Sequence, residues 1–274
     1  SFSNQSFNES DGVLAISSAI STCVLKVSNP KSFKTVFSTC HTPITSVAHI
    51  LSELIAVSDT SAMYINSLAD EITLNKIPIQ KRRICSMIFS QEANMLFAGR
   101  SDGVLMAHDI RCKNSLIGEK LIFSEPIFTL KAMERSTVAI CGERGIGFFD
   151  PRNFKLSSGL SIKFPYSAAT PISSSKLAYV ESHSFGSVLV IVDSQSNNFE
   201  KTRFDFEIDE LLFWEKNKSL LAISSEGEDK SKLTEISIKQ SDTPRNPIVK
   251  SLEACDICKG FISQSTDRLS LISE

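Results

Sequence analysis

Long apolar runs are missing from this sequence of 274 residues, and none reaches the roughly 18 residues that a membrane-spanning helix needs. The first residues, SFSNQSFNESDG, lack the basic and apolar regions of a secretory signal peptide. A charge excess is also missing, because 29 Lys and Arg residues nearly balance 31 Asp and Glu residues. We therefore expect no membrane partner and no direct nucleic-acid contact, since both need a strong positive surface.

Recognisable catalytic motifs are missing too. The sequence contains no GxSxG, P-loop or dinucleotide-binding fingerprint. Its four histidines, His41, His49, His108 and His183, are spread over different strand-forming units of the chain. The glycine-rich stretch 142–147 lies between two strand-like runs and is read as a tight hairpin rather than a phosphate loop. We predict that the protein is not an enzyme and holds no cofactor and no metal.

The number and spacing of the cysteines do not indicate a set of disulfide bonds. Seven cysteines form an odd, scattered set, which indicates reduced thiols and a cytoplasmic or nuclear location. Cys255 and Cys258 have the spacing of half a zinc site. A structural zinc needs four ligands, and no second pair or histidine follows them. We read both as ordinary thiols.

What the chain does contain is a repeat. Short runs rich in Val, Ile, Phe and Ser alternate with turn-forming clusters of Gly, Asn, Asp and Ser, which is typical of β-strands. An Asp-x-Arg strand end, Asp109 and Arg111, recurs 41 residues later as Asp150 and Arg152. Asn66 and Asp193 continue the series with spacings of 43 residues on either side. A period near 40 predicts an array of four-stranded units.

Six full units are predicted, over residues 3–40, 44–77, 84–123, 127–164, 168–206 and 210–252. The tail supplies only two more strands, at 260–263 and 269–273, read as the second and third of a unit. The incomplete last unit requires completion, by an N-terminal strand or by a strand from a partner. Seven units are therefore favoured, with six as the alternative. An irregular β-sandwich with Asp at its strand ends stays open as another fold.

Particular stretches resemble WD40-repeat β-propellers. FAGRSDGVLMAHDIR, residues 97–111, is similar to the family's second strand, Asp-Gly turn and third strand. TCHTPITSVAHI, residues 39–50, resembles its Gly-His turn and first strand, with His41 at the His position. TDRLSLIS in the tail is similar to the turn and third strand again. The resemblance spans nearly the whole chain and is best over residues 41–196.

The sequence departs from the family at its signature residues. It has no Gly-His dipeptide, and the family's Trp is replaced by Ile65, His108, Phe149 and Val192. The hydrogen-bonded His-Asp-Trp network of that family is therefore incomplete in every unit. The resemblance still implies an all-β, WD40-like propeller that forms one domain over residues 1–274. It also implies a non-enzymatic protein-interaction scaffold, a subunit of a stable multiprotein complex whose partner completes or braces the last unit.

Four arginines are predicted to share one face of the propeller. Arg82 and Arg83 lie in the connection before the third unit, and Arg100 and Arg144 lie in the turns between second and third strands. The acidic neighbours Asp102 and Glu143 make a solvated mixed-charge surface one interpretation. The other is a patch for an acidic peptide or a phosphate-bearing segment, because arginine binds such groups with two hydrogen bonds.

Two further arginines are predicted on the opposite face. Asp109-Ile-Arg111 and Asp150-Pro-Arg152 resemble the Trp-Asp-x-Arg boxes by which some WD40 propellers dock on cullin-4 ubiquitin ligases, although the Trp is absent. The alternative function implied by this resemblance is a substrate receptor that docks through Arg111 and Arg152. In ordinary WD40 units the same Asp-x-Arg pattern caps a turn.

Overall fold

The structure is a computed structural model, and the residues it describes form strands, turns and short connections. Backbone and side chains are described for residues 43–51, 53–70, 72–79, 82–112, 115–134, 136–163, 166–196, 198–214, 218–224 and 232–238. The backbone alone is described for residues 4–8, 13–17, 22–26, 33–37, 225, 230–231, 249–255, 259–263 and 268–272. Within these ranges no helix is long and apolar enough to cross a membrane.

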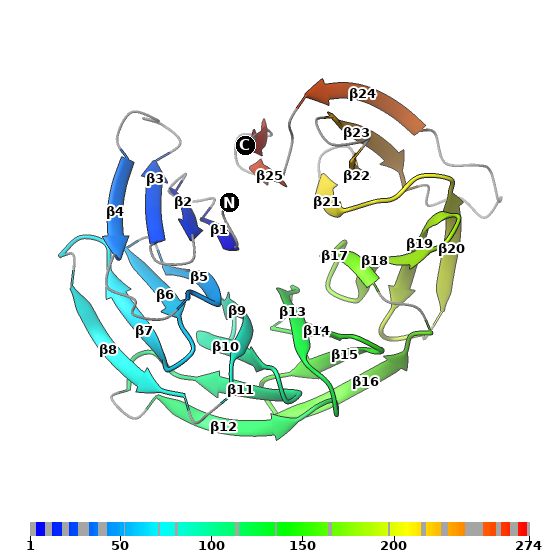
Figure 1. Cartoon of the computed structure of the whole chain (residues 1–274). Coiled ribbons are helices and arrows are strands. Elements are labelled where there is room, and N and C mark those ends of the chain that lie inside the picture. Colours follow the sequence, from blue (N-terminus) through cyan, green and yellow to red (C-terminus); the bar gives the residue numbers. More distant parts are fainter. Residues whose placement is uncertain are drawn as a thin grey trace. The chain divides into compact units, whose positions relative to one another are not determined.

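The described strands form six four-stranded antiparallel sheets and one two-stranded sheet (Figure 1). Sheet 1 contains β1 (Asn4–Asn8), β2 (Val13–Ser17), β3 (Thr22–Lys26) and β4 (Phe33–Phe37). Sheet 2 contains β5 (Ser46–Leu51), β6 (Leu54–Ser58), β7 (Ala62–Ser67) and β8 (Thr73–Pro78). Sheet 3 contains β9 (Ile84–Ser90), β10 (Met95–Arg100), β11 (Val104–His108) and β12 (Leu116–Leu121). Sheet 4 contains β13 (Ile127–Ala132), β14 (Val138–Gly142), β15 (Gly145–Asp150) and β16 (Lys155–Ser161).

The remaining sheets follow the same order along the chain. Sheet 5 contains β17 (Tyr166–Pro171), β18 (Lys176–His183), β19 (Gly186–Asp193) and β20 (Phe199–Phe204). Sheet 6 contains β21 (Glu210–Trp214), β22 (Ser219–Ser225), β23 (Lys230–Ser237) and β24 (Val249–Cys255). Sheet 7 contains β25 (Lys259–Ser263) and β26 (Arg268–Ile272). Each strand pairs with its neighbour in sequence, as the repeat predicts.

The chain divides into two compact units, residues 1–161 and residues 162–274. In the first unit the first strands of successive sheets lie side by side, β1 with β5, β5 with β9 and β9 with β13. In the second unit β17 lies beside β21, and β21 beside β25. This stacking of four-stranded sheets through their first strands is the blade arrangement of a β-propeller.

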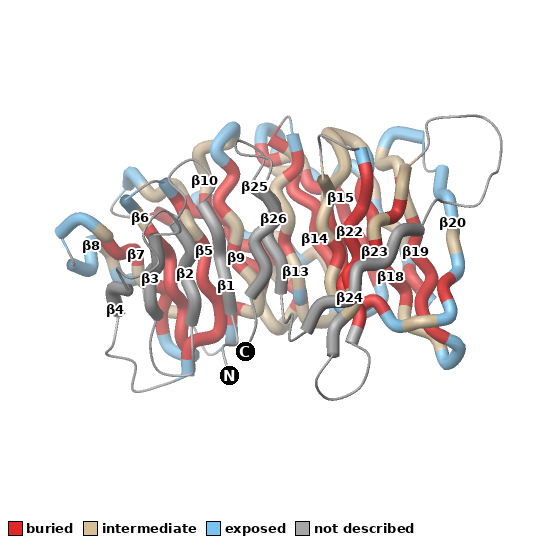
Figure 2. Tube along the Cα trace, turned by 90° about the horizontal axis from the view of Figure 1, so that it is seen from above, coloured by how far each residue is buried: buried red, intermediate tan, exposed pale blue. Residues whose placement is uncertain are grey.

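In sheets 2 to 5, burial changes from the middle to the edge of the sheet (Figure 2). The two middle strands are almost continuously buried, as in β14 with five buried residues out of five. The outer strands β8, β12 and β16 instead alternate between partly buried and exposed residues. A middle strand is covered on both faces and reads as an apolar run, whereas an outer strand meets water and needs polar side chains.

Apolar clusters join neighbouring sheets. Met63 of sheet 2 and Leu96 and Met106 of sheet 3 belong to one cluster. Phe97 of sheet 3 and Phe149 of sheet 4 belong to another, where their rings meet edge to face at 6.2 Å. In the second unit, buried side chains of sheets 5 and 6 form a third cluster that includes Val180, Leu220 and Ala222. Each large buried side chain stabilises the fold by about 1.5–3 kcal/mol relative to exposure.

The observed strands follow the predicted pattern with three differences. The fourth unit, expected to run to residue 164, ends earlier with β16 at Lys155–Ser161, because the turn after Asp150 is only four residues long. In the polar stretch 224–233, whose composition is typical of a loop, residues 224–225 and 230–233 belong to β22 and β23, since Ser224 pairs with Lys232 and Ser225 with Ser231. Strand β25 lies against β21 as a first strand does, so the tail occupies the first two places of its unit.

The hairpin expected at 142–147 is confirmed. Cys141 pairs with Ile146, and Glu143 and Arg144 form the turn between β14 and β15. N-terminal strand β1 pairs with β2 inside sheet 1. Among the described residues, β25 and β26 pair only with each other.

Candidate functional site

Aspartates at the ends of the third strands in sheets 3, 4 and 5 form one recurring turn. The Oδ1 atoms of Asp109, Asp150 and Asp193 each accept a hydrogen bond from the backbone N–H two residues later, at 3.0, 3.0 and 2.9 Å. Such Asx turns use the short aspartate side chain in place of a backbone carbonyl. Asn66 of sheet 2 differs, since its Oδ1 accepts a hydrogen bond from the Thr73 hydroxyl at 2.7 Å.

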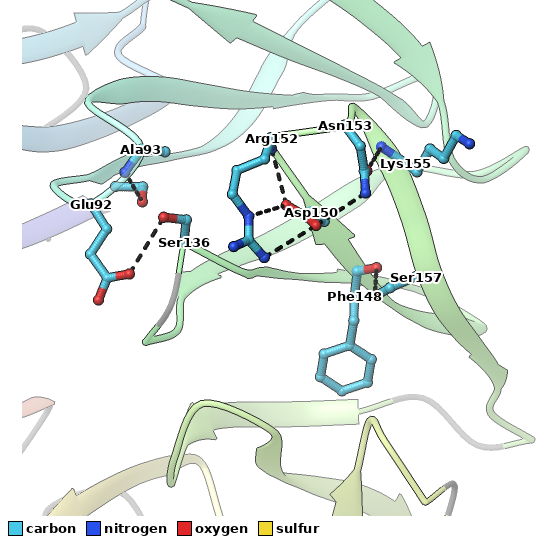
Figure 3. A network of polar contacts seen from close by, with 10 residues as sticks. Glu92, Ala93, Ser136, Phe148, Asp150, Arg152, Asn153, Lys155 and Ser157 are labelled. Atoms are coloured by element: carbon cyan, nitrogen blue, oxygen red, sulfur yellow. Dashed lines mark hydrogen bonds and ion pairs between the residues drawn. The ribbon is translucent and has the colours of Figure 1, made fainter.

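The turn of sheet 4 also binds the Arg152 guanidinium (Figure 3). Arg152 Nε lies 3.1 Å from Asp150 Oδ1, and Nη2 lies 3.3 Å from Oδ2. Asn153 Nδ2 donates to Asp150 Oδ2 at 3.1 Å, so the carboxylate is held on both oxygens. The side-chain hydrogen bonds from Arg152, with its backbone hydrogen bond and its charge, lower the pKa of Asp150. The Arg152 side chain nevertheless remains 72% exposed.

Sheet 3 repeats this arrangement. Arg111 Nε and Nη2 lie 2.8 and 2.7 Å from the two carboxylate oxygens of Asp109. The hydrogen bonds from Arg111 lower the pKa of Asp109 to about 2. Arg111 and Arg152, which we call the Asp-x-Arg pair, thus follow the third strands of sheets 3 and 4, as the sequence predicts. Each guanidinium is bound within its own turn, which is the turn-capping role.

The other ends of these strands carry the second set of predicted residues, which we call the Arg82 face: Arg82, Arg83, Arg100 and Arg144. Arg82 Nε and Arg100 Nη2 both approach Asp102 Oδ2, at 3.7 and 2.5 Å. Burial of Asp102 raises its pKa, but the hydrogen bond and charge of Arg100 outweigh it, so the pKa is lowered. The structure therefore brings Arg82 and Arg100 together around one carboxylate.

Arg100 differs from the other arginines of the Arg82 face in its exposure. Its side chain is only 14% exposed and also reaches Glu119 Oε1 at 3.4 Å, whereas Arg82 is 60% exposed. Arg83 and Arg144 are exposed as well. Arg82, Arg83 and Arg144 can therefore meet a partner, while Arg100 serves to hold Asp102 in the turn.

The connection between β12 and β13 lies beside both turns of the Arg82 face. Glu125 Oε1 accepts a hydrogen bond from the backbone N–H of Arg144 at 2.5 Å. On the other side, a Cβ on Gly103 would lie 2.0 Å from the carbonyl oxygen of Phe123. Gly103 also has a φ of +78°, so only glycine fits this close approach without strain. These contacts link the turns of sheets 3 and 4 at one end of the strands.

His108 and Cys141 are buried, whereas Cys112 is exposed. His108 is buried, shares a 3.1 Å hydrogen bond with Ser115 through Nδ1, and has a pKa lowered by burial to about 4. Burial raises the pKa of Cys141 to about 12, so its thiol is inert at neutral pH. No group of three His, Cys, Asp or Glu side chains among the described residues could hold a metal ion. His41 and Cys258 lie outside the described residues, and of Cys255 only the backbone is described.

Sequence reasoning missed a cluster in sheet 5. Glu181 is buried, and its carboxylate lies 3.1 Å from Lys201 Nζ and 3.5 Å from His183 Nε2. The ring of His183 stacks on Phe185 at 4.9 Å. The signal in the sequence was the alternation Phe199-x-Lys201-x-Arg203, which places three large side chains on one side of a strand.

The fold matches solved β-propellers. A chain in the crystal structure of a mitotic checkpoint complex has a TM-score of 0.82 and 14% identity over 98% of this chain and 83% of that chain. The β-propeller domain of Cps50 (Swd1) from Myceliophteria thermophila has a TM-score of 0.70 and 13% identity over 82% of this chain and 80% of that chain. No family model and no curated protein matches the sequence. The predicted all-β, WD40-like propeller fold is confirmed.

Proposed function

We propose that this protein is a non-enzymatic scaffold for protein–protein interactions, a subunit of a multiprotein complex in the cytoplasm or nucleus. The observation that carries the proposal is the contrast between rigid, buried strands and exposed, arginine-bearing turns at both of their ends. Loops on a rigid framework are the usual carriers of binding residues. One similar propeller comes from a mitotic checkpoint complex, which supports the same role by analogy of fold.

The Arg82 face is the proposed partner site, and an acidic or phosphate-bearing segment is its proposed ligand. Arg82, Arg83 and Arg144 offer guanidinium groups to carboxylates or phosphates. The acidic neighbours Asp102, Glu119, Glu125 and Glu143 offset these charges, which limits the site to a short ligand. A long polyanion would meet as many negative as positive side chains.

Affinity purification of the tagged chain followed by mass spectrometry tests the scaffold role. We expect a reproducible set of co-purifying proteins. The double variant Arg82→Glu and Arg83→Glu should reduce at least one of them about tenfold, while leaving the melting temperature unchanged because both side chains are exposed. Lys155→Glu, an exposed charge reversal at the start of outer strand β16 and outside both proposed sites, is the matched control. A chain that purifies alone would contradict the scaffold role, and equal recovery with all three proteins would contradict the Arg82 face.

A second candidate function is a substrate receptor that docks on a cullin-4 ubiquitin ligase through the Asp-x-Arg pair. The favouring observation is that Arg111 and Arg152 stay 66% and 72% exposed in equivalent turns of neighbouring sheets. Their pairing with Asp109 and Asp150 weakens this candidate, because docking would compete with these ion pairs. Co-purification with the ligase adaptor, lost in the variant Arg111→Ala with Arg152→Ala, would establish it.

Partner support of the last sheet also belongs to the proposal. Strands β25 and β26 fill two of the four places of the repeating unit. Two further strands would cover the open edge, which otherwise presents unpaired N–H and C=O groups. Hydrogen exchange of β26 amides in the isolated chain and in the purified complex tests this: slower exchange in the complex is expected.

A further inference from the structure

Outer strand β20 carries aromatic and cationic side chains on one side. Phe199, Lys201 and Arg203 stand opposite Val192, Val190 and Val188 of β19, so all three point to the same face of sheet 5. Strand β20 is the last in its sheet, and its outer edge has no pairing strand among the described residues of that sheet. An extended segment could therefore add to this edge through backbone hydrogen bonds.

The cationic side chains lie over aromatic rings. Lys201 Nζ is 5.8 Å from the centre of the Phe199 ring, and Arg203 Cζ is 5.6 Å from the centre of the Phe185 ring. His183 stacks on the same Phe185 ring. These cation–π contacts hold the long side chains in place, which lowers the entropy lost when a ligand binds. We call Phe185, Phe199, Lys201 and Arg203 the β20 stripe.

The fold itself does not require these rings to be exposed. Phe199 and Phe185 are 62% and 49% exposed, whereas the outer strands β8, β12 and β16, whose side chains are also described, contain no aromatic residue. Exposed aromatic rings beside arginine are typical of binding hot spots rather than of ordinary protein surface. The β20 stripe therefore has the composition of an interface.

The charges decide which class of partner fits. Buried Glu181 neutralises Lys201, with oxygens at 3.1 and 3.3 Å from Nζ. Arg203 therefore supplies the main positive charge of the stripe, and no ion pair joins it to an acidic side chain of the described residues. Nucleic acids need several phosphate-binding cations, which the β20 stripe lacks. One or two carboxylates with apolar neighbours would match both Arg203 and the rings.

We propose that the β20 stripe binds an extended partner segment, added as a strand along the outer edge of β20, that carries both acidic and apolar side chains at every second position. Residues two apart in a strand point to the same side, so all of these side chains would face the stripe. An acidic side chain would meet Arg203, and apolar ones would cover Phe199 and Phe185. This site uses no residue of the Arg82 face, so each of the two proposals can be disproved alone.

Selection from a random 12-residue peptide library on the immobilised protein tests the proposal. We expect enriched peptides in which both Asp or Glu and apolar residues occur at every second position, so that they share one side of the strand. A fluorescent enriched peptide should bind at least tenfold more weakly to Arg203→Glu and to Phe199→Ser. It should bind normally to Leu121→Ser, an exposed aliphatic control on β12, and N-methylation of its alternate backbone amides should abolish binding. Equal melting temperatures would show that the variants are folded.

Several outcomes would overturn the proposal. Absence of any enriched sequence, enrichment of basic peptides, or equal affinity for Arg203→Glu and wild type would each do so. Tighter binding of a single-stranded oligonucleotide than of the acidic peptide would assign the β20 stripe to nucleic acid instead.

Discussion

Sheets 4 and 5 have the same four-stranded order but differ in where they place aromatic side chains. Both end their third strand in the same Asx turn, at Asp150 and at Asp193. Sheet 4 buries Phe148 and Phe149 completely, whereas sheet 5 has Val192 at the position of Phe149 and exposes Phe185 and Phe199. The repeat therefore specifies the turn and the buried residue just before its aspartate. The outer strand is free to vary and can carry binding residues.

Truncating one phenylalanine from each sheet should give the largest contrast. Phe149→Ala would remove a buried ring that packs edge to face on Phe97 and Phe154, at 6.2 and 5.1 Å. We expect the free energy of unfolding to fall by about 3–5 kcal/mol. Phe199→Ala, with its ring mostly in water, should change it by less than about 0.5 kcal/mol. Urea denaturation measures both free energies of unfolding. Similar losses in the two variants would show that Phe149 and Phe199 do not differ in burial as the two sheets require.

The buried residue just before the strand-end aspartate differs between the sheets, and in sheet 3 it is His108. A buried histidine makes the stability of the fold depend on pH. Burial lowers the pKa of His108 to about 4, against about 6.5 in the unfolded chain. The unfolded state therefore binds a proton first as the pH falls, so this histidine stabilises the fold fully above pH 6.5. Stability should decrease between pH 6.5 and pH 4, by about 3 kcal/mol in total.

The variant His108→Gln isolates this effect. Glutamine can still share a hydrogen bond with Ser115 but does not titrate in this range. The difference in unfolding free energy between wild type and variant should shrink or reverse in the variant's favour as the pH falls from 7 to 4. A difference that is constant with pH would show that His108 is protonated as easily inside the fold as outside it.

The same comparison explains which features the sequence could predict. The apolar strands and the acidic strand ends at Asp109, Asp150 and Asp193 are local signals, so period, strand positions and turns were within reach. The environment of Arg100 was not, because its partner Glu119 lies on another strand and only the register of the sheet brings them together. Phe199 was missed because a phenylalanine in a strand is usually buried, and exposure depends on what covers the sheet.

The smallest expected effects separate the aspartate from the arginine in the turn of sheet 4. Asp150→Ala loses the hydrogen bonds to the Arg152 backbone and to Asn153, and should cost about 1 kcal/mol of stability. Arg152→Ala loses only an exposed ion pair and should cost clearly less stability than Asp150→Ala. Asp193→Ala in sheet 5, where Gln195 stands in place of the arginine, is the matched control and should resemble Asp150→Ala.

Salt separates the two contributions further, and thermal unfolding at low and high ionic strength measures it. Sodium chloride should remove the small effect of Arg152→Ala, because exposed ion pairs are screened. It should leave most of the loss in Asp150→Ala and Asp193→Ala, since the backbone hydrogen bonds of the turn do not need a cation. If Arg152→Ala were as costly as Asp150→Ala, the ion pair would be part of the frame of sheet 4. Arg152 would then not be available to a partner, which would remove the docking function proposed for the Asp-x-Arg pair.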